Sequence, residues 1–207
     1  MTARRRSVRR TVALAVTASV AALALTACGA DGDDKASGST GTATEAATGA
    51  GGHNAADVSF SKEMIQHHRQ AVEMASLATD RAASTQVKTL ATKIKGAQDP
   101  EIGTMSGWLT SWGEKVPQDM TGMGHDMSSS TPGMMTAADM GKLEKASGAA
   151  FDALFLDMMV EHHEGAVEMA RTEKADGSYR PATALAAEVI TAQSAEIEQM
   201  NKMLGKG

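Results

Sequence analysis

Two pairs of adjacent histidines are the residues of this chain best suited to chemistry. His67-His68 and His162-His163 hold four of the six histidines, and the second pair follows the first by 95 residues. One methionine lies a helical turn before each pair, and another lies two turns after it. Neutral imidazole is a common metal ligand, and thioether sulfur selects soft ions. The candidate metal ligands are Met64, His67, His68, Met74, Met159, His162, His163 and Met169.

Both pairs belong to an internal duplication. Residues 57–75 return as residues 152–170 with an Asp, a Phe, a Met, the His-His pair and an Ala-Val-Glu-Met-Ala run in the same register. At about 100° per residue, the histidines and methionines fall on one apolar stripe of a helix. The two stripes could form separate metal sites or converge on one. Alternatively, the histidines are hydrogen-bonded core residues and the flexible methionines fill gaps between helices.

The duplication continues into a second helix. Its chemistry-bearing positions are Gln98, Glu101 and Met105 in the first copy and Gln193, Glu196 and Met200 in the second, again 95 residues apart. Each copy is therefore predicted to be a helical hairpin. Two such hairpins predict an all-α four-helix bundle, in which Leu, Met, Ala and Val supply the core.

Capping and breaking residues set the expected helix boundaries. The first copy covers 57–112, the second covers 136–204, and the bundle as a whole covers 57–207. The expected helices are 57–82, 84–112, a short one at 136–145, 148–174 and 181–204, with Asp57, Ser84 and Thr136 as N-caps. Pro100 removes one hydrogen bond from the second helix, so a kink is expected there. Trp108 and Trp112 are expected to pack at an end of the bundle.

The linker between the two copies, residues 117–135, is rich in Gly, Pro, Ser and Met and is predicted to be an exposed loop. Five methionines in such a loop would not be core filler, because exposed thioether is open to oxidation. Clustering of sulfur around one imidazole indicates a binding site for soft metal ions. The candidate loop site is Met120, Met123, His125 and Met127. The alternative is a low-complexity linker in which the methionines are incidental.

The start of the chain indicates export. Residues 1–27 combine five arginines with a short apolar run, too short for a membrane span, and Leu-Thr-Ala-Cys at 25–28 resembles a bacterial lipoprotein cleavage box. The resemblance implies cleavage before Cys28 and lipidation of its thiol, and an uncleaved anchor or an ordinary secreted protein are the alternatives. Arg9-Arg10 is a weak match to a twin-arginine signal. Residues 28–56, rich in Gly, Ala, Ser and Thr, are predicted to be a disordered tether.

The charge balance limits the partners of the mature chain. Without the signal arginines, 15 basic residues remain against 25 acidic ones, so the net charge is near −10. This argues against nucleic acid, whose binding needs basic patches, and it mildly attracts cations. Cys28 is the only cysteine, so any metal site must use His, Met, Asp and Glu. Contact with the membrane is expected only through the lipid, at the outer face of the cytoplasmic membrane or elsewhere in the cell envelope.

The motif Phe-x-x-x-Met-x-x-His-His-x-x-Ala-Val-x-Met-Ala, followed by Gln-x-x-Glu-Ile-x-x-Met, resembles the bacterial family called "domain of unknown function 305". The resemblance covers residues 57–112 and 136–204. It implies a ferritin-like four-helix bundle that is usually exported, with some members implicated in copper binding. By motif position the candidate ligands are the eight His and Met residues given above, and the positions that could support them are the Gln, Glu and Met of the second helices. Pro100 beside Glu101 departs from an ideal helix there.

Three functions follow as hypotheses. The first is an extracytoplasmic protein that captures or buffers copper, since Met and His suit Cu(I) and His with carboxylate suits Cu(II); iron or zinc fit less well. The second is a ferritin-like oxidoreductase, which is less favoured because a di-iron centre wants Glu-x-x-His and neither His pair has it. The third is a metal-free structural or interaction bundle. No hydrolase triad or phosphate-binding loop is evident in the sequence, so an enzyme is less expected than a binding protein.

Overall fold

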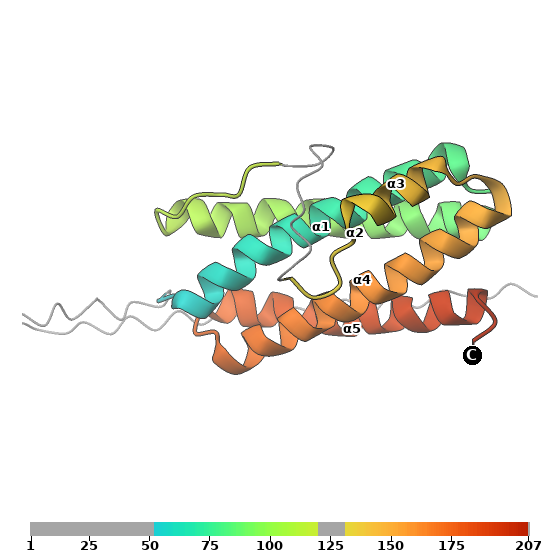
Figure 1. Cartoon of the computed structure of the whole chain (residues 1–207). Coiled ribbons are helices and arrows are strands. Elements are labelled where there is room, and N and C mark those ends of the chain that lie inside the picture. Colours follow the sequence, from blue (N-terminus) through green and yellow to red (C-terminus); the bar gives the residue numbers. More distant parts are fainter. Residues whose placement is uncertain (1–51, 120–130, 207) are drawn as a thin grey trace, which may run out of the picture. The chain divides into compact units, whose positions relative to one another are not determined.

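The computed structural model describes residues 52–119 and 131–206, which form five helices (Figure 1). The helices are α1 (Ala55–Arg81), α2 (Thr85–Ser111), α3 (Ala137–Lys145), α4 (Gly148–Asp176) and α5 (Arg180–Met203). Four long helices and one short one match the sequence-based prediction closely. The signal segment, Cys28, most of the tether and the loop residues Met120, Met123, His125 and Met127 lie outside the described residues.

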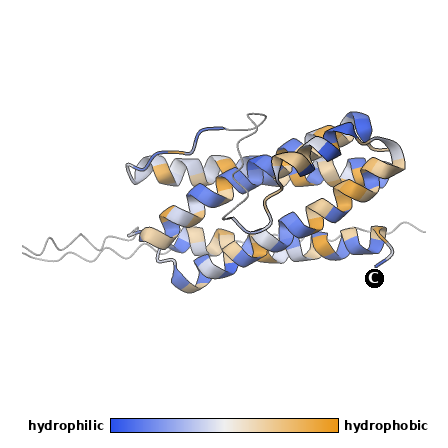
Figure 2. Ribbon diagram, in the orientation of Figure 1, coloured by the Kyte–Doolittle hydropathy of each residue, from blue (hydrophilic) through white to orange (hydrophobic). Residues whose placement is uncertain are grey.

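The long helices form two hairpins, as the duplication predicts. α1 packs against α2, α4 packs against α5, and the hairpins meet chiefly where α1 crosses α4. Apolar and polar residues alternate along each helix (Figure 2), because one face of each is buried. The chain is therefore an all-α bundle. None of the described helices has the length and apolarity that a membrane crossing would need.

Local signals explain most helix ends. Ser84 caps α2 by accepting from the backbone N–H groups of Gln86 and Val87, and Thr136 caps α3 by accepting from Asp139. The prediction that Asp57 caps α1 is wrong by one turn: Asn54 is the N-cap, and Asp57 is the third helical residue of its capping box. A carboxylate at that position accepts a hydrogen bond from the backbone N–H of the N-cap residue. Both residues therefore look like caps in the sequence. The α2 helix continues through Pro100.

The connection between the hairpins returns to the core before α3 begins. Gln70 of α1 donates to the backbone oxygen of Met135 at 2.9 Å and accepts from its backbone nitrogen at 2.7 Å. Met135 is 6% exposed and belongs to the core, so the prediction of an exposed loop is wrong at this residue. The reason is that Met135 is the last hydrophobic residue before a helix cap, and α3 packs on α1 and α4.

Aromatic side chains close one end of the bundle. Trp108 and Trp112 lie with ring centroids 6.3 Å apart, and Tyr179 packs edge-on against both. His53 stacks on Trp112 with a centroid distance of 4.4 Å. These contacts join the start of α1, the end of α2 and the α4–α5 connection, as expected for the tryptophans.

Candidate metal centre

The central contact of the molecule joins one histidine from each hairpin. His67 on α1 and His162 on α4 lie with ring centroids 3.7 Å apart and their planes tilted by 39°. Both residues are 0% exposed. The two apolar stripes therefore converge where α1 crosses α4, which was one of the two possibilities left open by the sequence.

The second histidine of each pair points to its own hairpin partner. The Nε2–H of His68 donates to Glu101 Oε2 at 2.6 Å, and the Nε2–H of His163 donates to Glu196 Oε2 at 2.7 Å. With the proton on Nε2, Nδ1 keeps its lone pair, and neither Nδ1 has a hydrogen-bond partner among the described residues. A carboxylate that fixes the tautomer of an imidazole in this way is the usual support of a metal-binding histidine.

The connection between the hairpins covers His67. The Nε2–H of His67 donates to the backbone oxygen of Pro132 at 3.1 Å. This approach requires glycine on both sides: a Cβ on Gly165 of α4 would lie 2.2 Å from the Pro132 oxygen, and Gly133 has φ +73°. Gly165 stands where the first copy has Gln70, which binds the same connection by side-chain hydrogen bonds.

Burial keeps the two central histidines uncharged. Removal from water, followed by repulsion from neighbouring imidazoles, holds the pKa of His67 and of His162 well below the ordinary value for histidine. Neutral imidazole is the form that binds metals. Within residues 52–119 and 131–206, both ring nitrogens of His162 and Nδ1 of His67 are without a hydrogen-bond partner. Buried nitrogens without partners are costly, so they indicate a missing ligand or a functional role.

The methionines of the two stripes gather in two clusters that mix the hairpins. Met64 of α1, Met105 of α2 and Met169 of α4 belong to one hydrophobic cluster. Met159, Met200 and Met74, which correspond to them in the duplication, belong to the other. All six are buried, with Met169 the most exposed at 7%. Each half of the centre therefore has sulfur from both hairpins in its cluster.

The predicted supporting residues occupy equivalent places in the two halves. Glu101 and Glu196 bind histidines, as described above. Gln98 and Gln193 are 3% and 4% exposed, and no described residue donates a hydrogen bond to the side-chain oxygen of either. Sequence reasoning missed the Pro132 carbonyl, whose only signal was a glycine, Gly165, where the repeat has Gln70.

The donor set favours a soft ion. Within residues 52–119 and 131–206, no three His, Cys, Asp or Glu side chains are grouped so that they could hold a metal. A centre built from imidazole alone would thus be incomplete, and thioether sulfur is the other donor buried in both hydrophobic clusters. Mixed nitrogen and sulfur donors suit Cu(I) better than Mg²⁺, Ca²⁺ or Mn²⁺. The unpartnered imidazole nitrogens fit such a group.

Comparison with known proteins identifies the family to which the chain belongs. The sequence profile of the family described as "Domain of unknown function (DUF305)" matches residues 57–204, and the chain belongs to this family. The same family includes a solved protein from Streptomyces coelicolor that is described as secreted. It is 34% identical, with a TM-score of 0.65 over 73% of this chain and 93% of that one. A search of curated proteins gives no match.

Other similar structures contain metals. CopM in its Cu(II)-bound form is 34% identical, with a TM-score of 0.62 over 71% of this chain and 94% of that one. CopM in its Cu(I)-bound form is 31% identical, with a TM-score of 0.59 over the same shares of the two chains. CopM is also known in silver-bound forms. The family therefore includes a protein that binds copper and silver ions.

Proposed function

We propose that this member of the DUF305 family is an exported, lipid-anchored protein that captures or buffers copper. An ion would be held between the hairpins by the His67–His162 pair together with thioether sulfur. The other candidate ligands are His68, His163, Met64, Met74, Met159 and Met169, which are divided between the two halves and would not all bind one ion. The observation that carries the proposal is the pair itself: two buried, uncharged imidazoles in contact, with three of their four nitrogens unpartnered in the part of the chain that the structure describes. CopM, which is similar over the same helices, binds copper and silver.

The cellular part of the proposal rests on the sequence. The basic and apolar start, followed by the box at residues 25–28, supports export and lipidation of Cys28. Outside the cytoplasm no thiol of this chain would remain free, so capture of copper falls to imidazole and thioether. Buffering needs no reaction, which is consistent with the lack of a grouped carboxylate centre in the described residues.

A purely structural bundle is the main competitor, and one substitution separates the two. Neither ring nitrogen of His162 has a side-chain partner among the described residues, so His162→Leu removes two buried nitrogens without breaking a side-chain hydrogen bond. Replacing an unpartnered polar group by an apolar one of similar size should leave the free energy of unfolding unchanged or raise it by about 1 kcal/mol. We expect its affinity for Cu(I), measured against a competing chelator, to fall at least about tenfold.

The matched control is His53→Ala, which removes an exposed imidazole at the end of the bundle. This variant should retain the affinity of the unaltered chain. Wild-type affinity in a folded His162→Leu variant would contradict the proposal. Loss of stability in His162→Leu, without metal binding by the unaltered chain, would instead favour the structural bundle.

A further inference from the structure

The duplication creates two equivalent grooves between α1 and α4, and only one is filled. The filled groove lies between the end of α1 and the start of α4, where α3 packs on both helices (Figure 1). Leu143 of α3 is 0% exposed and Met140 is 9% exposed, in one cluster with Phe151, Phe155 and Met158 of α4. These side chains of α3 and α4 fill the groove with buried apolar atoms.

The equivalent groove, between the start of α1 and the end of α4, holds a cavity of about 200 Å³. Its lining includes the exposed side chains of Ser59, Glu63, Glu168 and Thr172, and the cavity therefore reaches the surface. In the filled groove the duplication places Leu154, Met158, Glu73 and Leu77 at these positions. The open groove thus has small or acidic residues where the filled groove has, apart from Glu73, apolar ones.

The inner wall of the cavity is the cover of the histidine pair. Pro132 lines the cavity, and its backbone oxygen accepts the hydrogen bond of His67. Met169 lines it as well and lies in the methionine cluster of that half of the centre. An ion in the cavity would therefore meet the Pro132 residue that covers His67 and the thioether of Met169, one of the candidate ligands.

A buried carboxyl group also lines the cavity. Glu173 is 1% exposed, and neither of its oxygens accepts a hydrogen bond from the described residues. Its neighbour is the carboxylate of Asp57, which is held by the backbone N–H groups of Ser178 and Tyr179. The filled groove has Ala78 at the position of Glu173. The exposed carboxylates of Glu63 and Glu168 give the mouth of the cavity an electrostatic preference for cations.

We infer that the open groove is the access channel through which a soft metal cation reaches and leaves the His67–His162 pair. The inference rests on the proposed function, because it assumes that the pair binds metal. It assigns different tasks to the two grooves: α3 seals one side of the centre, and the acidic cavity admits ions on the other. Carboxylates at the mouth attract the hydrated cation, and Met169 is the first soft ligand that the ion meets.

The test closes the channel without touching the histidines. Ser59→Leu with Thr172→Leu introduces the residues that the filled groove carries, at two exposed helical positions that tolerate leucine. The purified chain is loaded with Cu(I), and release is followed after addition of an excess of a coloured Cu(I) chelator. The equilibrium affinity is measured separately by competition.

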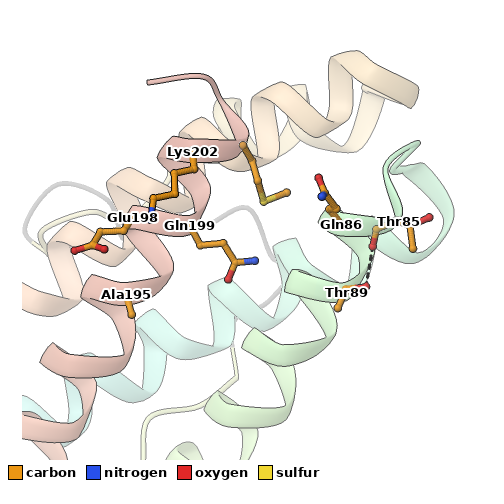
Figure 3. A pocket seen from close by; sticks show the side chains of 8 residues that line it. Thr85, Gln86, Thr89, Ala195, Glu198, Gln199 and Lys202 are labelled. Carbon is orange, nitrogen blue, oxygen red and sulfur yellow. Dashed lines mark hydrogen bonds between the residues drawn. The ribbon is translucent and has the colours of Figure 1, made fainter. Parts of the chain in front are cut away.

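The matched control is Thr89→Leu with Ala195→Leu. These exposed residues line a different cavity, of about 550 Å³, between α2 and α5 (Figure 3). We expect the channel variant to release Cu(I) at least about tenfold more slowly with unchanged affinity, because a plug slows binding and release alike. The control should behave as the unaltered chain does.

Three outcomes would overturn the inference. Unchanged release from the channel variant means that ions pass elsewhere, while the proposed copper binding stands. Equal slowing in both variants means that added apolar bulk, and not the channel, limits release. Absence of Cu(I) binding by the unaltered chain removes the proposed function and the access channel together.

Discussion

Glu101 holds His68 at 2.6 Å in the first hairpin, and Glu196 holds His163 at 2.7 Å in the second. The second histidine of each pair is therefore held in the same way on both sides of the crossing. The resemblance extends to the hairpin turns. Asp57 accepts from the backbone of Ser178 and Tyr179, and Asp152 accepts from the equivalent Ala83 and Ser84.

The two halves differ above the α1–α4 grooves. One groove is packed with Leu143, Met140 and Phe151, and the other keeps a cavity with Glu173 at its wall. The duplicated part of the molecule thus surrounds the histidines, while the parts that diverge control what covers them. From this difference we learn that the histidine pair is built from both hairpins, whereas the open cavity beside its cover lies on one side only.

The strongest way to sharpen this comparison is to empty the filled groove. Leu143→Ala should lower the free energy of unfolding by about 2–5 kcal/mol, because a fully buried leucine leaves a cavity that neighbours close only in part. Thr172→Ala, at the mouth of the open groove, should change it by less than about 0.5 kcal/mol. Both values come from denaturant unfolding followed by circular dichroism. Equal effects would show that the two grooves are packed alike.

The helices and their order could be predicted from the sequence because the hydrophobic period and the caps are local signals. Ser84 and Thr136 were identified correctly, and Asn54 was missed because Asp57 satisfies the same capping pattern three residues later. Glu101 and Glu196 were identified only as possible supporting positions of a family motif, and their pairing with His68 and His163 was not predicted.

The arrangement of the two hairpins could not be predicted in the same way. Contact between His67 and His162 depends on where α1 crosses α4, which involves side chains far apart in the sequence. The role of Pro132 depends on the path of a connection rich in Gly and Pro, whose composition predicts a loop but not its course. Nor does any periodic signal show that Glu173 faces Asp57 across the bundle.

A second prediction tests how alike the halves are at the centre. Glu101→Ala and Glu196→Ala should each cost about 1.5–3 kcal/mol in unfolding free energy, because each leaves a buried imidazole without its charged hydrogen-bond partner. The exposed Glu164→Ala is the control and should cost little. Chemical unfolding of the three variants side by side measures this. A difference above about 1 kcal/mol between the losses of unfolding free energy in Glu101→Ala and Glu196→Ala would contradict the equivalence. Pro100, which lies beside Glu101, would then be the first residue to examine.

The smallest effect concerns the carboxyl pair that only one half has. Burial, with the nearby Asp57 carboxyl, raises the pKa of Glu173 to about 8 from an ordinary value of 4.5. The folded protein therefore binds a proton that the unfolded chain has released, and stability should fall as the pH rises from about 4.5 through about 8. Hydrogen bonds from Asn54, Glu173, Tyr179 and Ser178 outweigh the burial of Asp57, so its pKa is lowered and Asp57 stays charged.

Glu173→Gln keeps the shape of the protonated acid but cannot lose the proton. We expect it to flatten the pH dependence between pH 6 and 9 and to raise the unfolding free energy at pH 9 by roughly 1 kcal/mol, a figure discounted for water in the adjoining cavity. The exposed Glu168→Gln, on the same cavity, should leave the profile unchanged. Parallel profiles for Glu173→Gln and the unaltered chain would mean that the pair is charged when folded. Glu173 would then add a negative charge to the open groove that its filled counterpart, with Ala78 at the equivalent position, does not have.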